Sequence, residues 1–194
     1  RTVAYAGLHD HFLFDPTGPY FHWINMLGIW ISYDKWGLVW INVINLTVVI
    51  AIIDRIVLLF ANKYHNRISA IIMFILVFLL TKSDGMTVEA HSLIFQFLPL
   101  YLFLNYLYDN KYEKFPIRWT FVMGLCFLVI AFIRINNAFI NVAIIIVLAF
   151  IYLKNKDYVG LAKHFGIFVF AVAVASLPVI IVFGSKDVLD QVMH

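Results

Sequence analysis

Arg134 and the two asparagines that follow it stand between two strongly apolar runs, in the stretch FLVIAFIRINNAFINV (residues 127–142). A guanidinium group pairs with phosphate through two hydrogen bonds. If the second helix starts at Asn136 or Asn137, its free amide N–H groups also favour an anion. The pattern therefore predicts a receptor for a phosphate at headgroup depth. The alternative is that Arg134 only reaches toward headgroups from a helix end.

Glu89 begins an apolar run within DGMTVEAHSLIFQF (residues 84–97). A carboxylate at a helix N-terminus is stabilised by the helix dipole by about 0.3–1 kcal/mol, which could explain Glu89 without any function. The functional alternative is that Glu89 orients a substrate hydroxyl or a catalytic water. His91 lies two residues later and so on another face of the helix. It is expected to be a satisfied interface histidine or, with Arg134, to contact the substrate.

Two acidic residues near the start of the chain are further candidates for catalysis. Asp15 precedes a proline and has turn formation as its simplest role. Asp10 lies between His9 and His11. That alternating spacing is not typical of a zinc site, so a divalent metal stays an open alternative and no cofactor is assigned.

Asp54 and Arg55 stand side by side near the end of a long apolar run. Adjacent residues do not face each other on a helix. We therefore expect Asp54 to pair with another helix and Arg55 to extend toward headgroups. A transport role for Asp54 is the alternative.

The composition bounds the class of protein. Of the 194 residues, 63% are hydrophobic and 13% are charged, and the mean hydropathy is +0.91. A soluble domain carries about 25% charged residues. The sequence therefore predicts an all-α, polytopic bundle of transmembrane helices. The basic residues of such a protein mark its cytoplasmic side, so the net charge of +3 does not indicate a nucleic-acid partner. The lone Cys126 excludes an internal disulfide.

The apolar runs predict about six spanning helices in a single membrane domain, 1–194. Residues 1–35 are expected to form an outer loop and an interfacial helix, because residues 19–33 are short and aromatic. Residues 36–183 hold the spans, and 184–194 form an outer loop. We expect the chain to be a fragment of a longer protein. The expected spans are 36–60, 68–81, 89–108, 119–133, 138–153 and 161–183.

The basic residues orient these spans. The loops 61–67, 109–118 and 154–164, placed on one side, account with their flanks for nine of the 14 Lys and Arg residues. This side is therefore expected to be cytoplasmic. The opposite, outer side collects Asp10, Asp15, Glu89, His91 and Arg134.

Three motifs on the expected outer side resemble those of polytopic glycosyltransferases of the C-type fold, in a poorly characterised bacterial branch. They are FDPTGPYFHWINMLG (14–28), DGMTVEAHSLIFQF and GLCFLVIAFIRINN (124–137). Protein O-mannosyltransferases and the lipid A aminoarabinose transferase belong to the same superfamily. The chain departs from the pattern at Thr17, where the family has a lysine, and at Ala90, where it has a second glutamate. The family's first membrane helix and its acidic catalytic base would lie before Arg1.

The resemblance implies an enzyme of the cytoplasmic membrane that transfers a sugar from a polyprenyl-phosphate donor to an envelope or lipid acceptor on the outer face. Arg134, with Asn136 and Asn137, would bind the donor phosphate. Glu89 would orient sugar or acceptor, and Asp15, with Asp10 in reserve, would stand near the reacting centre. The alternatives are a transporter or flippase for a lipid-linked or anionic solute, and a non-catalytic assembly subunit.

Overall fold

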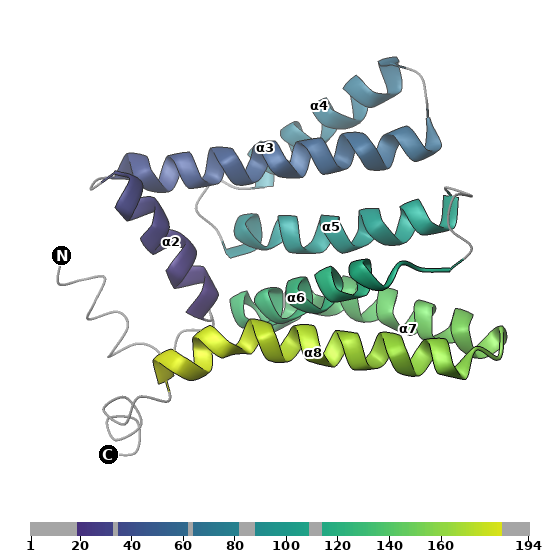
Figure 1. Cartoon of the computed structure of the whole chain (residues 1–194). Helices are drawn as coiled ribbons and strands as arrows, with labels where there is room; N and C mark the ends of the chain where they lie inside the picture. Colours follow the sequence, from purple (N-terminus) through teal and green to yellow (C-terminus); the bar gives the residue numbers. More distant parts are fainter. Residues whose placement is uncertain (1–18, 33–34, 62–63, 82–87, 109–113, 184–194) are drawn as a thin grey trace.

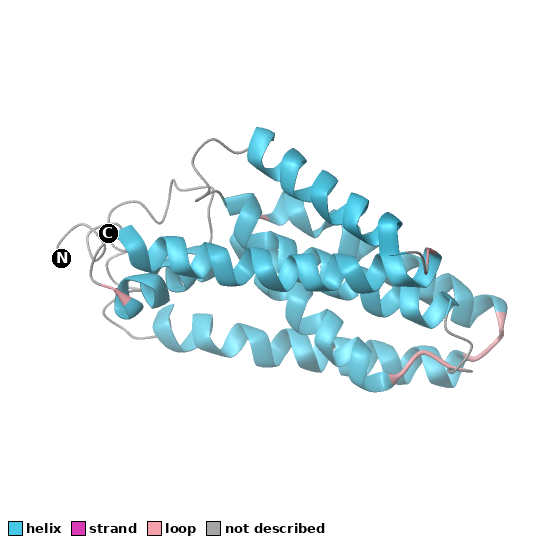
Figure 2. Cartoon of the chain, turned by 90° about the horizontal axis from the view of Figure 1, so that it is seen from above, coloured by secondary structure: helices cyan, strands magenta, loops and turns pink. Residues whose placement is uncertain are grey.

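All regular secondary structure in the part of the chain that the structure describes is helical (Figure 2). The computed structural model describes residues 19–32, 35–61, 64–81, 88–108 and 114–183. The expected all-α class is confirmed over these residues. The helices are α2 (Pro19–Ile31), α3 (Lys35–Phe60), α4 (Tyr64–Thr81), α5 (Val88–Tyr108), α6 (Ile117–Ile133), the 3-10 turn η1 (Ile135–Ala138), α7 (Phe139–Lys154) and α8 (Tyr158–Phe183).

The long helices run back and forth between two ends (Figure 1). At one end α3, α5 and α7 finish and α6 and α8 begin; we call it the basic end, because it is the side to which the sequence assigns most Lys and Arg residues. At the opposite end, which we call the rim end, α5 and α7 begin and α6 finishes beside η1. Helix α2 lies obliquely across the rim end (Figure 1). The helix ends that flank the three loops grouped by the charge distribution therefore lie at one end of the bundle (Figure 1).

Three helices of the described chain are long and apolar enough to cross a membrane, within Trp36–Phe60, Ile135–Lys154 and Tyr158–Ile181. Their outward faces carry exposed aliphatic and aromatic side chains, including Ile44, Ile146 and Phe170. In a hydrocarbon environment a helix satisfies its own backbone, so the β-branched residues that fill these segments do not prevent helix formation. The exposed apolar surface is thus suited to lipid contact rather than to water.

Two helices begin earlier than the hydrophobic pattern indicates. Helix α4 starts at Tyr64 rather than near residue 68, and α8 starts at Tyr158 rather than near 161. The polar residues of the extra turns are accommodated locally. Arg67 pairs with Asp54 of α3, and Asp157 caps α8 through a 2.8 Å hydrogen bond from the Gly160 amide to its Oδ1. A hydropathy pattern does not include such partners.

The core lies among α5, α6, α7 and the segment that precedes α6. Its buried cluster consists of Phe103, Phe115, Met123, Ile144 and Tyr152. Helix α8 packs chiefly against α6, and this contact passes over Gly124. A methyl group added at Gly124 would lie 2.7 Å from Cβ of Ala171, so a glycine is required there for the two helices to touch.

Candidate functional site at the rim end

A cluster of polar side chains joins α5 to the segment that follows Arg134. The side-chain amide of Asn137 donates a 2.9 Å hydrogen bond to Oγ of Ser92, and that of Gln96 donates to the same hydroxyl at 3.1 Å. Asn141, one turn beyond Asn137, donates to the carbonyl oxygen of Phe95 at 3.2 Å. We call these four side chains the rim cluster: Ser92, Gln96, Asn137 and Asn141.

Two of the four side chains of the rim cluster are fully buried in the apolar bundle. Ser92 is 0% exposed and Asn141 is 1% exposed. Among the described residues, Oδ1 of Asn141 has no hydrogen-bond partner. A buried acceptor left in this state costs on the order of 1–3 kcal/mol. Neutral polar side chains of this kind hydrogen-bond between helices in membrane bundles, so the rim cluster fastens α5 to η1 and α7 at this end.

Helix α2 packs against the rim end through aromatic side chains. The hydroxyl of Tyr20 donates to the carbonyl oxygen of Ala175 in α8, and its ring lies 6.2 Å from that of Phe132 in α6. The ring of Phe21 meets the imidazole of His91 edge to face, with centroids 5.3 Å apart. These contacts fasten α2 to three helices at the rim end. His91 is 2% exposed, so its visible role is packing under α2.

Arg134 stands at the junction between α6 and η1. Its backbone is extended (φ −164°, ψ 116°), which ends α6, while its amide still donates to the carbonyl of Ile130 at 2.8 Å. The side chain is half-buried, and that of Asn136 is exposed. Arg134 therefore follows the last turn of α6, at the same end of the bundle as the first turn of α5.

The geometry corrects one expectation about this junction. A regular helix starting at Asn136 or Asn137 would leave both amides free, but the chain first makes the 3-10 turn η1. The amide of Asn137 there donates to the carbonyl of Arg134 at 2.9 Å. Its side chain is likewise committed to Ser92. The backbone amide of Asn137 is therefore engaged within the turn and is not free to bind an anion.

Glu89 and Arg134, the two residues expected to define the site, belong to segments that meet at the same end of the bundle. Glu89 lies in the first turn of α5, and Ser92 in that helix is bonded to Asn137, three residues after Arg134. This is the placement that a shared site requires. Asp10 and Asp15 lie outside the described residues. Over the described part of the chain, no group of three or more His, Cys, Asp or Glu side chains could hold a metal ion.

Asp54 is paired in the way the sequence indicates. Both oxygens of its carboxylate accept from Arg67, at 2.7 Å from Nε and 2.6 Å from Nη2, which ties α3 to α4 near the basic end. The prediction that Asp54 pairs with another helix is confirmed. A carboxylate held by a two-pronged ion pair already has a structural role, which weakens the case for transport through Asp54.

Sequence reasoning missed three members of the rim cluster: Ser92, Gln96 and Asn141. A signal for them was present. Ser92 and Gln96 are four residues apart, which places them on one face of α5, and Asn137 and Asn141 have the same spacing in the sequence. The spacing identifies a polar face on each segment, whereas the contact between the two faces is decided by the tertiary structure.

A scan against models of known protein families found no match, and neither did searches of curated proteins and of solved structures. Function must therefore be argued from the residues themselves.

Proposed function

We propose that this chain is the membrane part of a glycosyltransferase that takes a sugar from a polyprenyl-phosphate donor at the rim end and passes it to an envelope or lipid acceptor. In this proposal α3 to α8 all span the cytoplasmic membrane, and α2 lies in the outer interface. The resemblance of the three motifs supplies the reaction class. The rim end supplies the site.

One observation supports the proposal above others: the hydrogen bond from Asn137 to Ser92. It fastens the turn after Arg134 to the beginning of α5, where Glu89 stands. A cation and a carboxylate on two helices are thereby kept at one end of an apolar bundle. An anchor has no need of this pairing, whereas a headgroup with a phosphate and a sugar has both an anion and hydroxyls to be bound.

The reaction is a substitution at C1 of the sugar. The acceptor oxygen forms a bond to C1 while the bond from C1 to the phosphate oxygen breaks, and the phosphate keeps the electron pair. A carboxylate takes the acceptor proton, the role assigned to Asp15 or Asp10. Arg134 stabilises the charge that grows on the departing lipid phosphate. Glu89 hydrogen-bonds sugar or acceptor hydroxyls.

Replacing Arg134 with Ala in the full-length protein tests this assignment. Loss of a group that stabilises charge in the transition state lowers kcat by roughly 10²–10³-fold. The measurement is transfer of a radiolabelled sugar from a polyprenyl-phosphate donor in proteoliposomes. Arg118→Ala is the matched control, since Arg118 is an exposed arginine in the first turn of α6, at the basic end. Transfer at the wild-type rate by Arg134→Ala would remove the proposed phosphate site.

Glu89→Gln separates the catalytic role of Glu89 from a helix-capping role in the same assay. The proposal expects slower turnover with an unchanged melting temperature. A lower melting temperature with normal turnover per folded molecule would instead assign Glu89 to the helix dipole alone.

A further inference from the structure

The turn between α7 and α8 holds a lysine in an unusual conformation. Lys156 has φ 55°, in the left-handed region. Its amide donates to the carbonyl of Leu153 at 3.0 Å, and the amide of Asp157 donates to that of Tyr152 at 3.0 Å. These two bonds form a Schellman motif at the end of α7, in which the left-handed position is usually glycine.

A lysine at this position is strained by its Cβ, and a glycine would not be. Strained non-glycine residues cluster at functional sites, where the side chain serves a purpose. Lys156 therefore calls for a role for its ammonium group, in addition to the turn itself.

Lys156 lines an open polar pocket at the basic end. The pocket has a volume of about 370 Å³ and is formed by α5, the segment before α6, α7 and the α7–α8 turn. Lys114 in its wall bonds Oδ2 of Asp157 at 2.7 Å. Among the described lining residues, two ammonium groups stand against one carboxylate, which is a net positive charge. Its lining residues are Tyr106, Lys114, Ile151, Tyr152, Asn155, Lys156 and Asp157.

An apolar cavity of about 150 Å³ lies next to this pocket, between α6, α7 and α8. Its wall contains three polar side chains, but they satisfy one another. The hydroxyl of Thr120 lies 2.5 Å from Nδ1 of His164, and the hydroxyl of Tyr152 lies 2.8 Å from Nε2. Both ring nitrogens are engaged, so the cavity presents carbon to an occupant. The other walls include Met123, Leu148 and Phe165.

Tyr152 belongs to both walls, so the polar pocket and the apolar cavity are neighbours on either side of one side chain. We propose that these two spaces together bind one anionic phospholipid of the leaflet at the basic end, with its phosphate at Lys156 and Lys114 and part of one acyl chain in the cavity. Basic pockets between membrane helices on the cytoplasmic side bind anionic headgroups in this way. The inference is independent of the proposed transferase activity.

The dimensions fit an acyl chain. An apolar cavity of about 150 Å³ accommodates a ligand of roughly six carbon atoms, such as benzene. The rest of the chain can lie along the outer face of α8, where Phe165 is 67% exposed. The quaternary ammonium of phosphatidylcholine offsets the charge of its phosphate, so a positively charged pocket should prefer phosphatidylglycerol, whose headgroup has a net negative charge.

Native mass spectrometry of the full chain with phosphatidylglycerol measures the affinity. Each lysine near the surface attracts an anionic headgroup, so Lys114→Gln and Lys156→Gln should each weaken binding roughly fivefold. Lys163→Gln is the matched control, since Lys163 is exposed near the same end but lines neither space. Equal weakening by Lys163→Gln would overturn the proposal, because only the general charge of the basic end would then matter. Unchanged binding in both pocket variants would overturn it as well.

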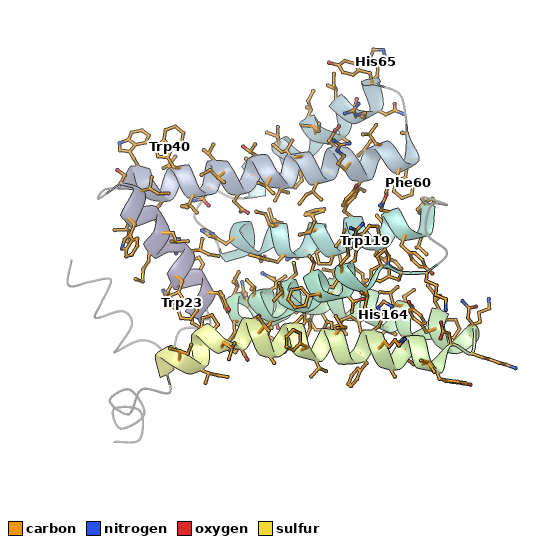
Figure 3. The ribbon with its side chains drawn as sticks, in the orientation of Figure 1. Trp23, Trp40, Phe60, His65, Trp119 and His164 are labelled. Carbon is orange, nitrogen blue, oxygen red and sulfur yellow. The ribbon has the colours of Figure 1, made fainter. Side chains whose placement is uncertain are left out.

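Tryptophan quenching locates the acyl chain. Trp119 lies toward the basic end near His164, whereas Trp23 and Trp40 lie at the rim end (Figure 3). The ring of Trp119 is 5.7 Å from that of Phe115, which lines the cavity. With the other four tryptophans changed to Phe, brominated phosphatidylglycerol should quench Trp119 more strongly than brominated phosphatidylcholine. Ala149→Leu, which fills the cavity, should remove that difference. Equal quenching by both lipids, or quenching unaffected by Ala149→Leu, would overturn the proposal.

Lys156→Gly separates a role in lipid binding from a role in the turn alone, because only the first makes the substitution weaken phosphatidylglycerol binding. Glycine relieves the strain and should raise the melting temperature, while removal of the ammonium should weaken phosphatidylglycerol binding roughly fivefold. Binding at wild-type strength by this variant would assign Lys156 to the turn alone and overturn the proposal.

Discussion

Gly124 shows at the scale of one residue how the bundle is packed. A Cβ at this position would lie 2.7 Å from Cβ of Ala171 and 2.8 Å from the backbone oxygen of Phe168. The backbone cannot yield locally, so Gly124→Ala forces α6 and α8 apart. We expect a loss of about 1–3 kcal/mol in unfolding free energy. Reversible unfolding in mixed micelles measures it.

Gly166 in α8 is the matched control for Gly124. An added Cβ there meets no atom within 4 Å, so Gly166→Ala should be neutral or stabilising by about 0.5–1 kcal/mol. Comparable losses in both variants would mean that helix contact is not what requires Gly124. Gly124 is also the first residue of the 124–137 motif that contains Arg134, so at least one motif position has a packing explanation.

At the scale of one helix, Asp157 matters because its carboxylate caps the beginning of α8. The hydrogen bond from Lys114, and after it the one from the Gly160 amide, lowers the pKa of Asp157 below its ordinary value of about 3.9. A carboxylate whose pKa is lowered in the folded state contributes stability above its unfolded pKa. That contribution is lost as the pH falls through the folded pKa.

We therefore expect Asp157→Asn to lower the melting temperature at pH 7, since asparagine keeps a capping oxygen but loses the charge. The difference from wild type should shrink as the pH falls below about 4 and vanish once Asp157 is protonated. Thermal unfolding of both proteins between pH 7 and pH 2.5 measures it. A difference that does not change with pH would show that the charge of Asp157 contributes nothing.

The arrangement of the whole molecule predicts which residues share a side of the membrane. Asn136 is exposed at the rim end, and Lys154 and Asn155 are exposed at the basic end. In a Cys126→Ala background, Asn136→Cys should react with a membrane-impermeant maleimide on intact cells. Asn155→Cys should react only after permeabilisation. Gel-shift labelling measures both. Labelling of the two positions from the same side would overturn the proposed orientation, while Lys154→Cys serves as a second reporter for the basic end.

The whole-molecule view also separates the two proposals. The transferase site uses Arg134 and the beginning of α5 at the rim end, whereas the lipid site uses Lys114, Lys156 and the cavity at the basic end. The helices α6 and α7 contribute to both, from opposite ends. Failure of Arg134→Ala to affect transfer would leave the lipid site intact, and loss of lipid binding would leave the transferase proposal unchanged.

Local chemistry was enough to predict much of the fold. Apolar runs must become helices where no water can satisfy the backbone, so the helical class and the positions of α3, α5 and α7 follow from composition and length. The grouping of three loops at one end follows from alternation, because each helix that crosses the bundle returns the chain to the other end. The pairing of Asp54 with another helix follows from the cost of leaving a carboxylate alone among apolar groups.

Only the tertiary structure decided which polar groups meet. Hydropathy does not say which faces of α5 and α7 touch, so the bond between Asn137 and Ser92 was not foreseeable from either segment alone. The backbone amide of Asn137 is hydrogen-bonded within a 3-10 turn that the sequence pattern does not predict. Thr120 of α6 and Tyr152 of α7 both hydrogen-bond to His164 of α8. Helix periodicity determines what each segment can bury, whereas the partners depend on how close the helices approach, as Gly124 permits for α6 and α8.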